Sequence, residues 1–225
     1  MPALALLFSR RWPTSLRWLL TWLTGLLICT AVAQNNASRY NESNNETVVA
    51  WRRMIEQARP QTTDEKLQAV NQFFNRRLHF TSDQVAWGVD DYWATPLEFM
   101  LNGQGDCEEF AIAKYVSLLV LGIPSDRLRL IYVRARFGSI NSGNSEAHMV
   151  LGYYADPAGE PLILDNLLNS IRPAASRPDL LPVFSFNSQG LWVPGSPKPA
   201  ASDPTVRLSR WRNLLDRLSS EGLKL

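Results

Sequence analysis

A glycine-rich turn followed by an apolar helical pattern is the feature that most constrains this fold. The turn covers residues 102–106, and its two glycines allow backbone conformations that other residues avoid. From Cys107 onward, apolar residues recur at helical spacing and form one face: Ile112, Tyr115, Val116, Leu119 and Val120. The pattern ends at Gly122 with Pro124 just beyond, which is typical of a helix C-terminus. The sequence therefore predicts a buried helix with Cys107 at or next to its first turn.

Three apolar segments after this helix predict strands over residues 128–135, 147–154 and 161–166. The connections between them are short enough for hairpins, so the sheet is expected to be antiparallel. Two further helices are predicted upstream, over residues 48–58 and 64–76. The predicted fold class is α+β, with the Cys107 helix packed on an antiparallel sheet.

The C-terminal third is harder to interpret. Residues 172–205 carry seven prolines, and we interpret this stretch as an extended surface segment. Asp203 and Pro204 then predict the start of a final helix. Its apolar residues share one face: Val206, Leu208, Trp211, Leu215 and Leu218. This face is interpreted as core packing in preference to binding at a membrane surface.

The first residues indicate export. Three arginines precede an apolar run that ends in Ala31-Val32-Ala33, so residues 1–33 are interpreted as a signal peptide and the protein as periplasmic. An uncleaved inner-membrane anchor is the alternative. Residues 34–47 are polar and rich in asparagine, which predicts a disordered leader. Residues 48–225 are then expected to form a single domain.

Removal of the signal peptide changes the charge and the thiol count. Residues 1–33 hold three of the 23 basic residues and none of the 21 acidic ones, which leaves a net charge of −1. The composition therefore gives no reason to expect a nucleic-acid partner. Cys29 also lies in this segment, so Cys107 is the single thiol of the mature chain. A lone cysteine is either a small buried apolar residue or a reactive group.

Three residues together predict cysteine-based catalysis. A helix N-terminus favours the thiolate form of Cys107. The nucleophile needs a general base, and His148 begins an apolar strand, whereas His79 follows a helix among basic residues. Asp165 lies at the polar end of the next strand, where it can orient the imidazole. Each residue alone has an ordinary structural explanation, and the prediction depends on their combination.

Carboxylates surround the thiol at Asp106, Glu108 and Glu109. Nearby negative charge raises the pKa of a cysteine, which disfavours the thiolate. Asp106 and Glu108, with Asp90 or Asp91, can supply oxygen ligands for calcium. From spacing alone, a solvated acidic helix start is the preferred interpretation.

Several segments resemble one known family, the bacterial transglutaminase-like cysteine proteinases, and within it the LapG-type periplasmic proteases. The similar segments span residues 91–96, 105–115, 147–151, 164–166 and 177–183, and the resemblance extends from about residue 51 to residue 193. It implies a papain/transglutaminase-like core and a triad of Cys107, His148 and Asp165. It also implies calcium dependence, with ligands at Asp106, Glu108 and Asp91.

The resemblance further implies a substrate and a regulator. Family members cleave the N-terminal region of a large cell-surface adhesin at a di-alanine site, which releases biofilm cells. They are inhibited by the periplasmic domain of an inner-membrane cyclic-di-GMP receptor of the LapD type. Two alternatives stay open from sequence: an acyltransferase or transglutaminase-type enzyme with the same triad, and a non-enzymatic binding module of the same fold.

Overall fold

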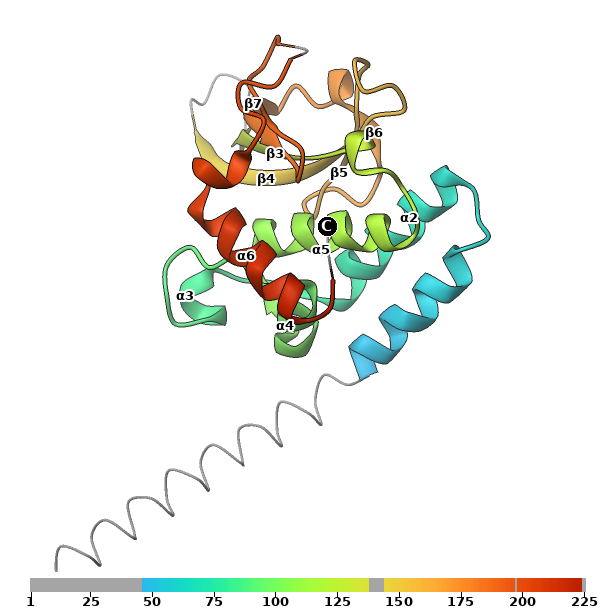
Figure 1. Ribbon diagram of the computed structural model, residues 1–225. Helices are drawn as coiled ribbons and strands as arrows, with labels where there is room; N and C mark the ends of the chain where they lie inside the picture. Colours follow the sequence, from blue (N-terminus) through green and yellow to red (C-terminus); the bar gives the residue numbers. More distant parts are fainter. Residues whose placement is uncertain (1–45, 138–143, 197, 224–225) are drawn as a thin grey trace, which may run out of the picture. The chain divides into compact units, whose positions relative to one another are not determined.

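The helices lie below a six-stranded sheet in the computed structural model (Figure 1). The structure describes residues 46–137, 144–196 and 198–223. The predicted signal peptide and residues 34–45 of the predicted leader lie outside these ranges. The described residues belong to a unit that spans Asn44–Leu225. Within them, no helix has both the length and the apolar character that crossing a membrane requires.

The helices begin and end close to their predicted positions. A helix covers residues 46–58. It is followed by α2 (Thr63–Arg77), α3 (Asp83–Ala86), α4 (Pro96–Asn102), α5 (Cys107–Val120), three short 3-10 turns (Ser125–Arg127, Ala174–Ser176 and Pro204–Val206) and α6 (Ser209–Ser220). Thr62 caps α2 and Asp106 caps α5, each in a reciprocal capping box with a glutamate three residues later. Cys107 is therefore the first residue of α5, as predicted.

The main sheet is antiparallel throughout, with strand order β6-β5-β4-β3-β7-β8. Its central strands are β3 (Leu128–Arg136) and β4 (Ser145–Tyr153), and β5 (Leu162–Leu164) lies beside β4. These are the three predicted strands, so the α+β prediction is confirmed. A small parallel pair joins β1 (His79–Phe80) to β2 (Gln104–Gly105), which fixes the turn before Cys107.

The prediction of an extended surface segment over residues 172–205 is wrong. This stretch contains β6 (Arg172–Pro173), β7 (Leu180–Phe186) and β8 (Leu191–Trp192), and β7 pairs with β3 inside the sheet. Pro182 is accommodated because the register between β3 and β7 shifts there, between Tyr132 and Val133. A proline is tolerated at such an irregularity, where a regular ladder hydrogen bond is already absent.

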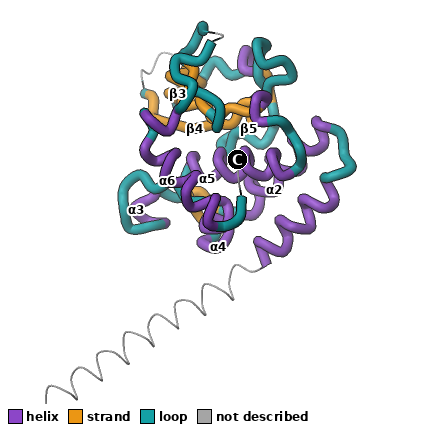
Figure 2. Tube along the Cα trace, viewed as in Figure 1, coloured by secondary structure: helices purple, strands orange, loops and turns teal. Residues whose placement is uncertain are grey.

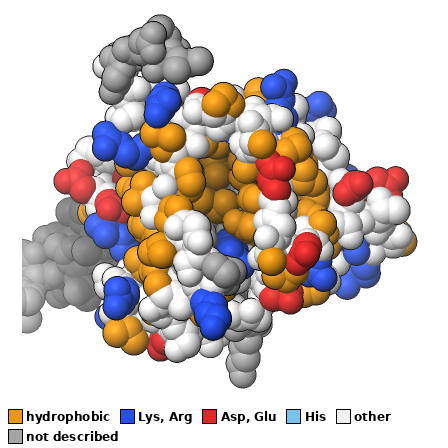
Figure 3. Space-filling model, turned by 90° about the horizontal axis from the view of Figure 1, so that it is seen from above, with side chains coloured by type: hydrophobic (Ala, Val, Ile, Leu, Met, Phe, Trp, Pro, Cys, Tyr) orange, Lys and Arg blue, Asp and Glu red, His pale blue; other side chains and the backbone are white. Residues whose placement is uncertain are grey.

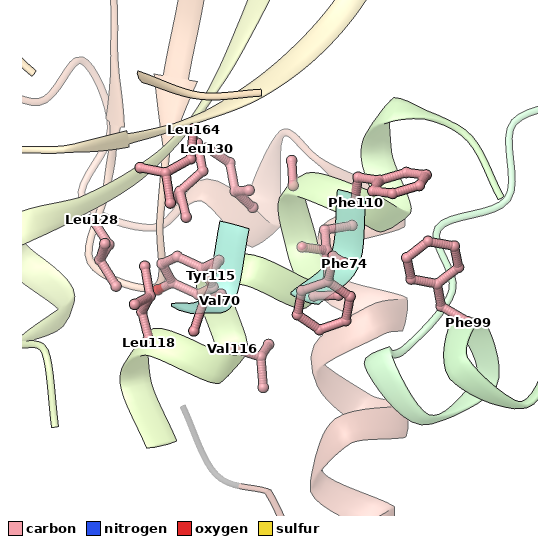
Figure 4. Close-up of a cluster of buried hydrophobic side chains, with 14 of the residues drawn as sticks. Val70, Phe74, Phe99, Phe110, Tyr115, Val116, Leu118, Leu128, Leu130 and Leu164 are labelled. Atoms are coloured by element: carbon pink, nitrogen blue, oxygen red, sulfur yellow. The ribbon is translucent and has the colours of Figure 1, made fainter. Parts of the chain in front are cut away.

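The core fills the space between the sheet and α2, with α5 in its centre (Figures 2 and 4). Side chains of α5 meet α2 on one side and the strands on the other: Phe110, Tyr115, Val116 and Leu118 from α5, Val70 and Phe74 from α2, and Leu128, Leu130 and Leu164 from the sheet. All of these side chains are buried. This packing holds the N-terminus of α5, and with it Cys107, at a fixed place.

The final helix packs on the core, which confirms the interpretation preferred from sequence. Trp211 is fully buried, and its ring lies 5.9 Å from that of Tyr115 and 5.3 Å from that of Phe186. The predicted apolar face is wrong at Val206, which is 76% exposed. Val206 ends a 3-10 turn, and α6 begins only at Ser209, so Val206 does not share the helical face.

A lysine lies inside the core at position 114. Lys114 is fully buried, its Nζ has no hydrogen-bond partner among the described residues, and it lies 5.9 Å from the Phe110 ring centroid. Burial lowers its pKa to about 7, although the nearby charge of Asp165 acts in the opposite direction. The pKa in the unfolded chain is about 10.4. Above pH 7 the unfolded state therefore binds a proton that the folded state has lost, so stability rises with pH up to about 10.

Lys114→Met is expected to stabilise the protein by a few kcal/mol at pH 6 and by progressively less toward pH 10. The substitution removes a buried, unpaired charge that disfavours folding most strongly below pH 7. Urea unfolding at a series of pH values measures the effect, with Lys198→Met as the control because Lys198 is exposed. A Lys114→Met protein that is less stable than the parent at pH 6 would contradict this account.

Candidate active site

Cys107 is buried at the start of α5, with 8% of its surface exposed, and forms no disulfide. Its Sγ donates a hydrogen bond to Glu108 Oε2 at 2.7 Å. Burial raises the pKa of the thiol, and the charges of Glu108 and Asp106 raise it further, whereas a backbone hydrogen bond from Met149 lowers it. The thiol therefore lies beside the residue that follows His148 on β4.

Gly105 lets a carboxylate approach the turn before Cys107. A Cβ atom at this position would lie 2.9 Å from both Glu109 Oε2 and Phe99 Cε2. Glu109 is fully buried, and its carboxylate accepts hydrogen bonds from the backbone N–H of Ala94 at 2.9 Å and of Asp106 at 3.0 Å. Glu109 thus joins the loop before α4 to the start of α5.

His148 and Asp165 form a direct pair. His148 lies on β4 opposite Val133 of β3, and Asp165 follows the last residue of β5. His148 Nε2 lies 2.8 Å from Asp165 Oδ1, and the two side chains are almost completely buried. The predicted orientation of an imidazole by an aspartate on the next strand is therefore present as a hydrogen bond.

Asp165 is held by three further contacts. Its Oδ1 accepts from the Leu167 N–H at 3.0 Å, and its Oδ2 accepts from Arg177 Nη2 at 2.7 Å. Its backbone carbonyl accepts from Asn75 Nδ2 of α2 at 2.7 Å. Burial acts to raise the pKa of Asp165, but the hydrogen bonds and charges of His148, Leu167 and Arg177 outweigh it and lower the pKa to about 2. The carboxylate is consequently ionised at neutral pH.

No hydrogen bond joins Cys107 to His148 in the part of the chain that the structure describes. The hydrogen bond of the thiol goes to Glu108 instead. Catalytic hydrogen bonds are commonly long or misaligned without substrate and become shorter in the reacting complex. Asp165 occupies Nε2, so Nδ1 is the imidazole nitrogen that remains for exchange of a proton with a nucleophile.

Two acidic groups near Cys107 have the geometry to hold a cation. The first is Asp106, Cys107 and Glu108, which includes two predicted calcium ligands. The second is Asp83, Asp106 and Glu109, and within each group the ligand atoms lie within 4.8 Å of one another. Only the second group offers oxygen ligands alone, and calcium prefers oxygen.

The second group has the electrostatic character of a cation site. Burial and neighbouring carboxylates raise the pKa of Asp106 and Glu109, and they raise the pKa of Asp83 to about 6. Asp83 Oδ1 is buried without a hydrogen-bond partner among the described residues. None of the three carboxylates forms an ion pair with a described lysine or arginine. Buried carboxylates this close to one another require a proton or a metal ion, so these residues fit a calcium ion.

Asp91, the third predicted ligand, makes a different contact. Its carboxylate forms an ion pair with Arg210 Nη2 of α6 at 2.7 Å, and both side chains are about half exposed. Asp91 also has a backbone φ of 56°, which is uncommon for a residue other than glycine. Asp91 belongs to neither carboxylate group, although its charge contributes to the raised pKa of Asp83. Its role as a ligand stays a prediction.

Sequence reasoning did not identify three residues of this site. Asp83 lies in a four-residue helix with no distinctive pattern, and Glu109 was interpreted as part of a solvated acidic helix start. Arg177 appeared only within a segment of family resemblance. The one local signal was the capping box of α5, in which Glu109 must fold back onto the turn.

Known proteins are similar to this chain over most of its length. The family model for the bacterial transglutaminase-like cysteine proteinases matches residues 35–193. The calcium-bound structure of LapG from Legionella pneumophila is 38% identical, with 82% of this chain and 96% of that chain covered and a TM-score of 0.68. The EGTA-treated form of the same protein is 39% identical, with 82% and 95% covered and a TM-score of 0.69. No curated protein matches the chain. The chain belongs to the bacterial transglutaminase-like cysteine proteinases and is a cysteine protease.

Proposed function

We propose that the protein is a calcium-dependent endopeptidase in which Cys107, His148 and Asp165 form the catalytic triad. The observation that carries the proposal is the 2.8 Å contact between His148 Nε2 and Asp165 Oδ1. His148 lies on β4, and the next residue of that strand, Met149, forms a backbone hydrogen bond with the Cys107 sulfur. A nucleophile at a helix start beside a histidine that an aspartate orients is the arrangement that acyl transfer requires.

The proposed reaction assigns one step to each residue. Cys107 transfers its proton to His148 Nδ1, and the sulfur attacks the peptide carbonyl to form a tetrahedral adduct. His148 returns the proton to the departing amine, which leaves a thioester. A water molecule, deprotonated by His148, then hydrolyses the thioester and regenerates the thiol. Asp165 keeps the ring in position through Nε2 and stabilises its positive charge, and the Cys107 backbone N–H is a candidate donor to the oxyanion.

Calcium is assigned to the carboxylates beside the thiol. Asp83, Asp106 and Glu109 fit the ion through oxygen chemistry, and Asp106, Glu108 and Asp91 are the ligand set expected from family resemblance. When bound, the ion supplies positive charge that offsets the carboxylates and favours the thiolate. The similarity to a LapG structure described as calcium-bound supports this assignment.

The proposed substrate is the N-terminal region of a large cell-surface adhesin, cleaved at a di-alanine site so that biofilm cells are released. The proposed location is the periplasm, and the proposed inhibitor is the periplasmic domain of an inner-membrane cyclic-di-GMP receptor of the LapD type. Relatedness to LapG supports these assignments. The predicted signal peptide is consistent with the location.

Product analysis tests the proposed reaction. The mature chain is incubated with the N-terminal fragment of a candidate adhesin, in calcium and with a primary amine present. Hydrolysis predicts two fragments whose masses together exceed the substrate by one water. Fragments that carry the amine, or cross-linked species, would instead identify an acyltransferase and overturn the peptidase assignment.

A further inference from the structure

A pocket of about 260 Å³ opens on the outer face of the sheet, away from α5 (Figure 3). Its floor consists of a second buried apolar cluster, which is separate from the main core: Ile131, Val133, Val150 and Ile163. The aromatic residues Phe184 and Trp192 also line the pocket. None of Cys107, His148 and Asp165 lines this pocket. The cavity therefore lies outside the triad, and Arg177, which contacts Asp165, lines it.

Among the described residues that line the pocket, the only charged ones are two arginines, Arg129 and Arg177. Arg177 is 6% exposed, and its Nη1 has no hydrogen-bond partner among the described residues. The Nε of Arg129 is also buried without such a partner. Leaving a buried N–H group unsatisfied costs about 1–3 kcal/mol. Both arginines thus line an apolar cavity, and each has a buried N–H group without a partner among the described residues.

The two guanidinium groups are held rigidly. Arg129 lies between two rings, with its Cζ 4.1 Å from the Trp192 centroid and 4.6 Å from the Tyr154 centroid. Arg177 donates from Nε to Asp179 Oδ1 at 3.0 Å and from Nη2 to Asp165 Oδ2 at 2.7 Å. Fixed donors lose little entropy when a ligand binds, which favours a specific site.

We propose that this pocket binds a small carboxylate with an apolar body, and that its occupation weakens cleavage through Arg177. The carboxylate pairs with the guanidinium groups of the two arginines that line the pocket, and the apolar body covers its floor. The volume suits one phenyl or branched-chain group better than a larger ligand. Arg177 forms an ion pair with Asp165, the residue that orients His148, so a ligand on Arg177 would affect the triad. This effect on cleavage rests on the proposed function.

Binding is tested with 3-phenylpropionate, with its neutral amide as the comparison. Calorimetry on the intact mature protein should show saturable binding of the acid and at least tenfold weaker binding of the amide. N-acetylphenylalanine carries the same carboxylate on a peptide unit and so mimics the C-terminus of a polypeptide. Comparison of its affinity with that of 3-phenylpropionate shows whether the pocket prefers a chain end or a free acid. Equal affinity for acid and amide, or no saturable binding of either acid, would overturn the proposal.

Two variants locate the site. Arg129→Gln removes one donor, and Ser185→Leu fills the cavity from a lining residue of β7, so each should weaken acid binding at least tenfold. Arg134→Gln is the matched control, because Arg134 is exposed on the same strand as Ile131 and does not line the pocket. Unchanged binding in a folded Ser185→Leu protein would place the acid elsewhere and refute the site.

Coupling to the active site has a separate readout. Saturating 3-phenylpropionate should lower the kcat of the parent protein severalfold. The kcat of Ser185→Leu should be the same with and without the acid. Saturable binding with no change in kcat would refute the coupling and retain the site. Because calorimetry does not require turnover, failure of the peptidase proposal and failure of the binding site are distinguishable.

Discussion

Cleavage is expected to disappear in Cys107→Ala and in His148→Gln and to persist in His79→Gln. Cys107 supplies the attacking sulfur, and His148 is the base that the Asp165 hydrogen bond orients. Loss of either member of such a unit lowers kcat by a factor on the order of 10⁶. The rate of product formation from the adhesin fragment, measured by quantitative mass spectrometry, checks this expectation.

The two histidines of the chain provide the matched control. His79 is exposed on β1, and its backbone rather than its ring contributes to the described structure, through an N–H bond to the Gly103 carbonyl at 3.1 Å. His79→Gln should therefore retain the rate of the parent within a factor of two. Circular dichroism of all three variants verifies folding. Residual cleavage above one part in about 10³ by folded Cys107→Ala would refute its role as nucleophile.

The position of Cys107 was predictable because its signals are local. A glycine-rich turn, an aspartate cap and an apolar helical stripe lie within the 19 residues 102–120, and each acts over a few residues of chain. The pairing of β4 with β5 was also accessible, since two apolar runs with a short connection form a hairpin. That pairing is what brings Asp165 to His148.

The missing parts of the prediction depend on contacts between distant segments. Asp83 meets Asp106 only because β1 and β2 pair and bring residues 79–80 to residues 104–105. Arg177 reaches Asp165 because the segment between them folds back along β5 through β6. Strand β7 was missed because a proline normally argues against an interior strand, and the register shift that accommodates Pro182 is a property of the pairing with β3.

From its spacing in the sequence, Glu109 was expected to be exposed to solvent, but it is buried. A run of acidic residues at a helix start is usually solvated and favoured by the helix dipole. Glu109 is instead fully buried, and its two oxygens accept backbone hydrogen bonds from Ala94 and Asp106. The group of Asp83, Asp106 and Glu109 is thus built into the core, where its negative charge has to be compensated.

Removal of calcium with EGTA is expected to lower cleavage at least 100-fold and to lower the unfolding temperature, and excess calcium should restore both. Calcium at 100 times its dissociation constant stabilises the folded state by about 2.7 kcal/mol. For a domain of this size each kcal/mol corresponds to about 2–4 °C, so the expected shift is about 5–10 °C. Differential scanning fluorimetry with and without calcium measures this shift independently of cleavage.

The carboxylate variants decide which residues hold the ion. Asp83→Asn and Glu109→Gln should each abolish the calcium-induced shift, because each removes a charged oxygen ligand from the buried group. Asp126→Asn, a substitution in the 3-10 turn between α5 and β3, is the control and should keep the full shift. If Glu108→Gln and Asp91→Asn abolish the shift while Asp83→Asn and Glu109→Gln retain it, calcium binds on the Cys107 side of Asp106 instead. In that case the compensation of the buried group comes from protons, and its carboxylates should titrate with pH whether or not calcium is present.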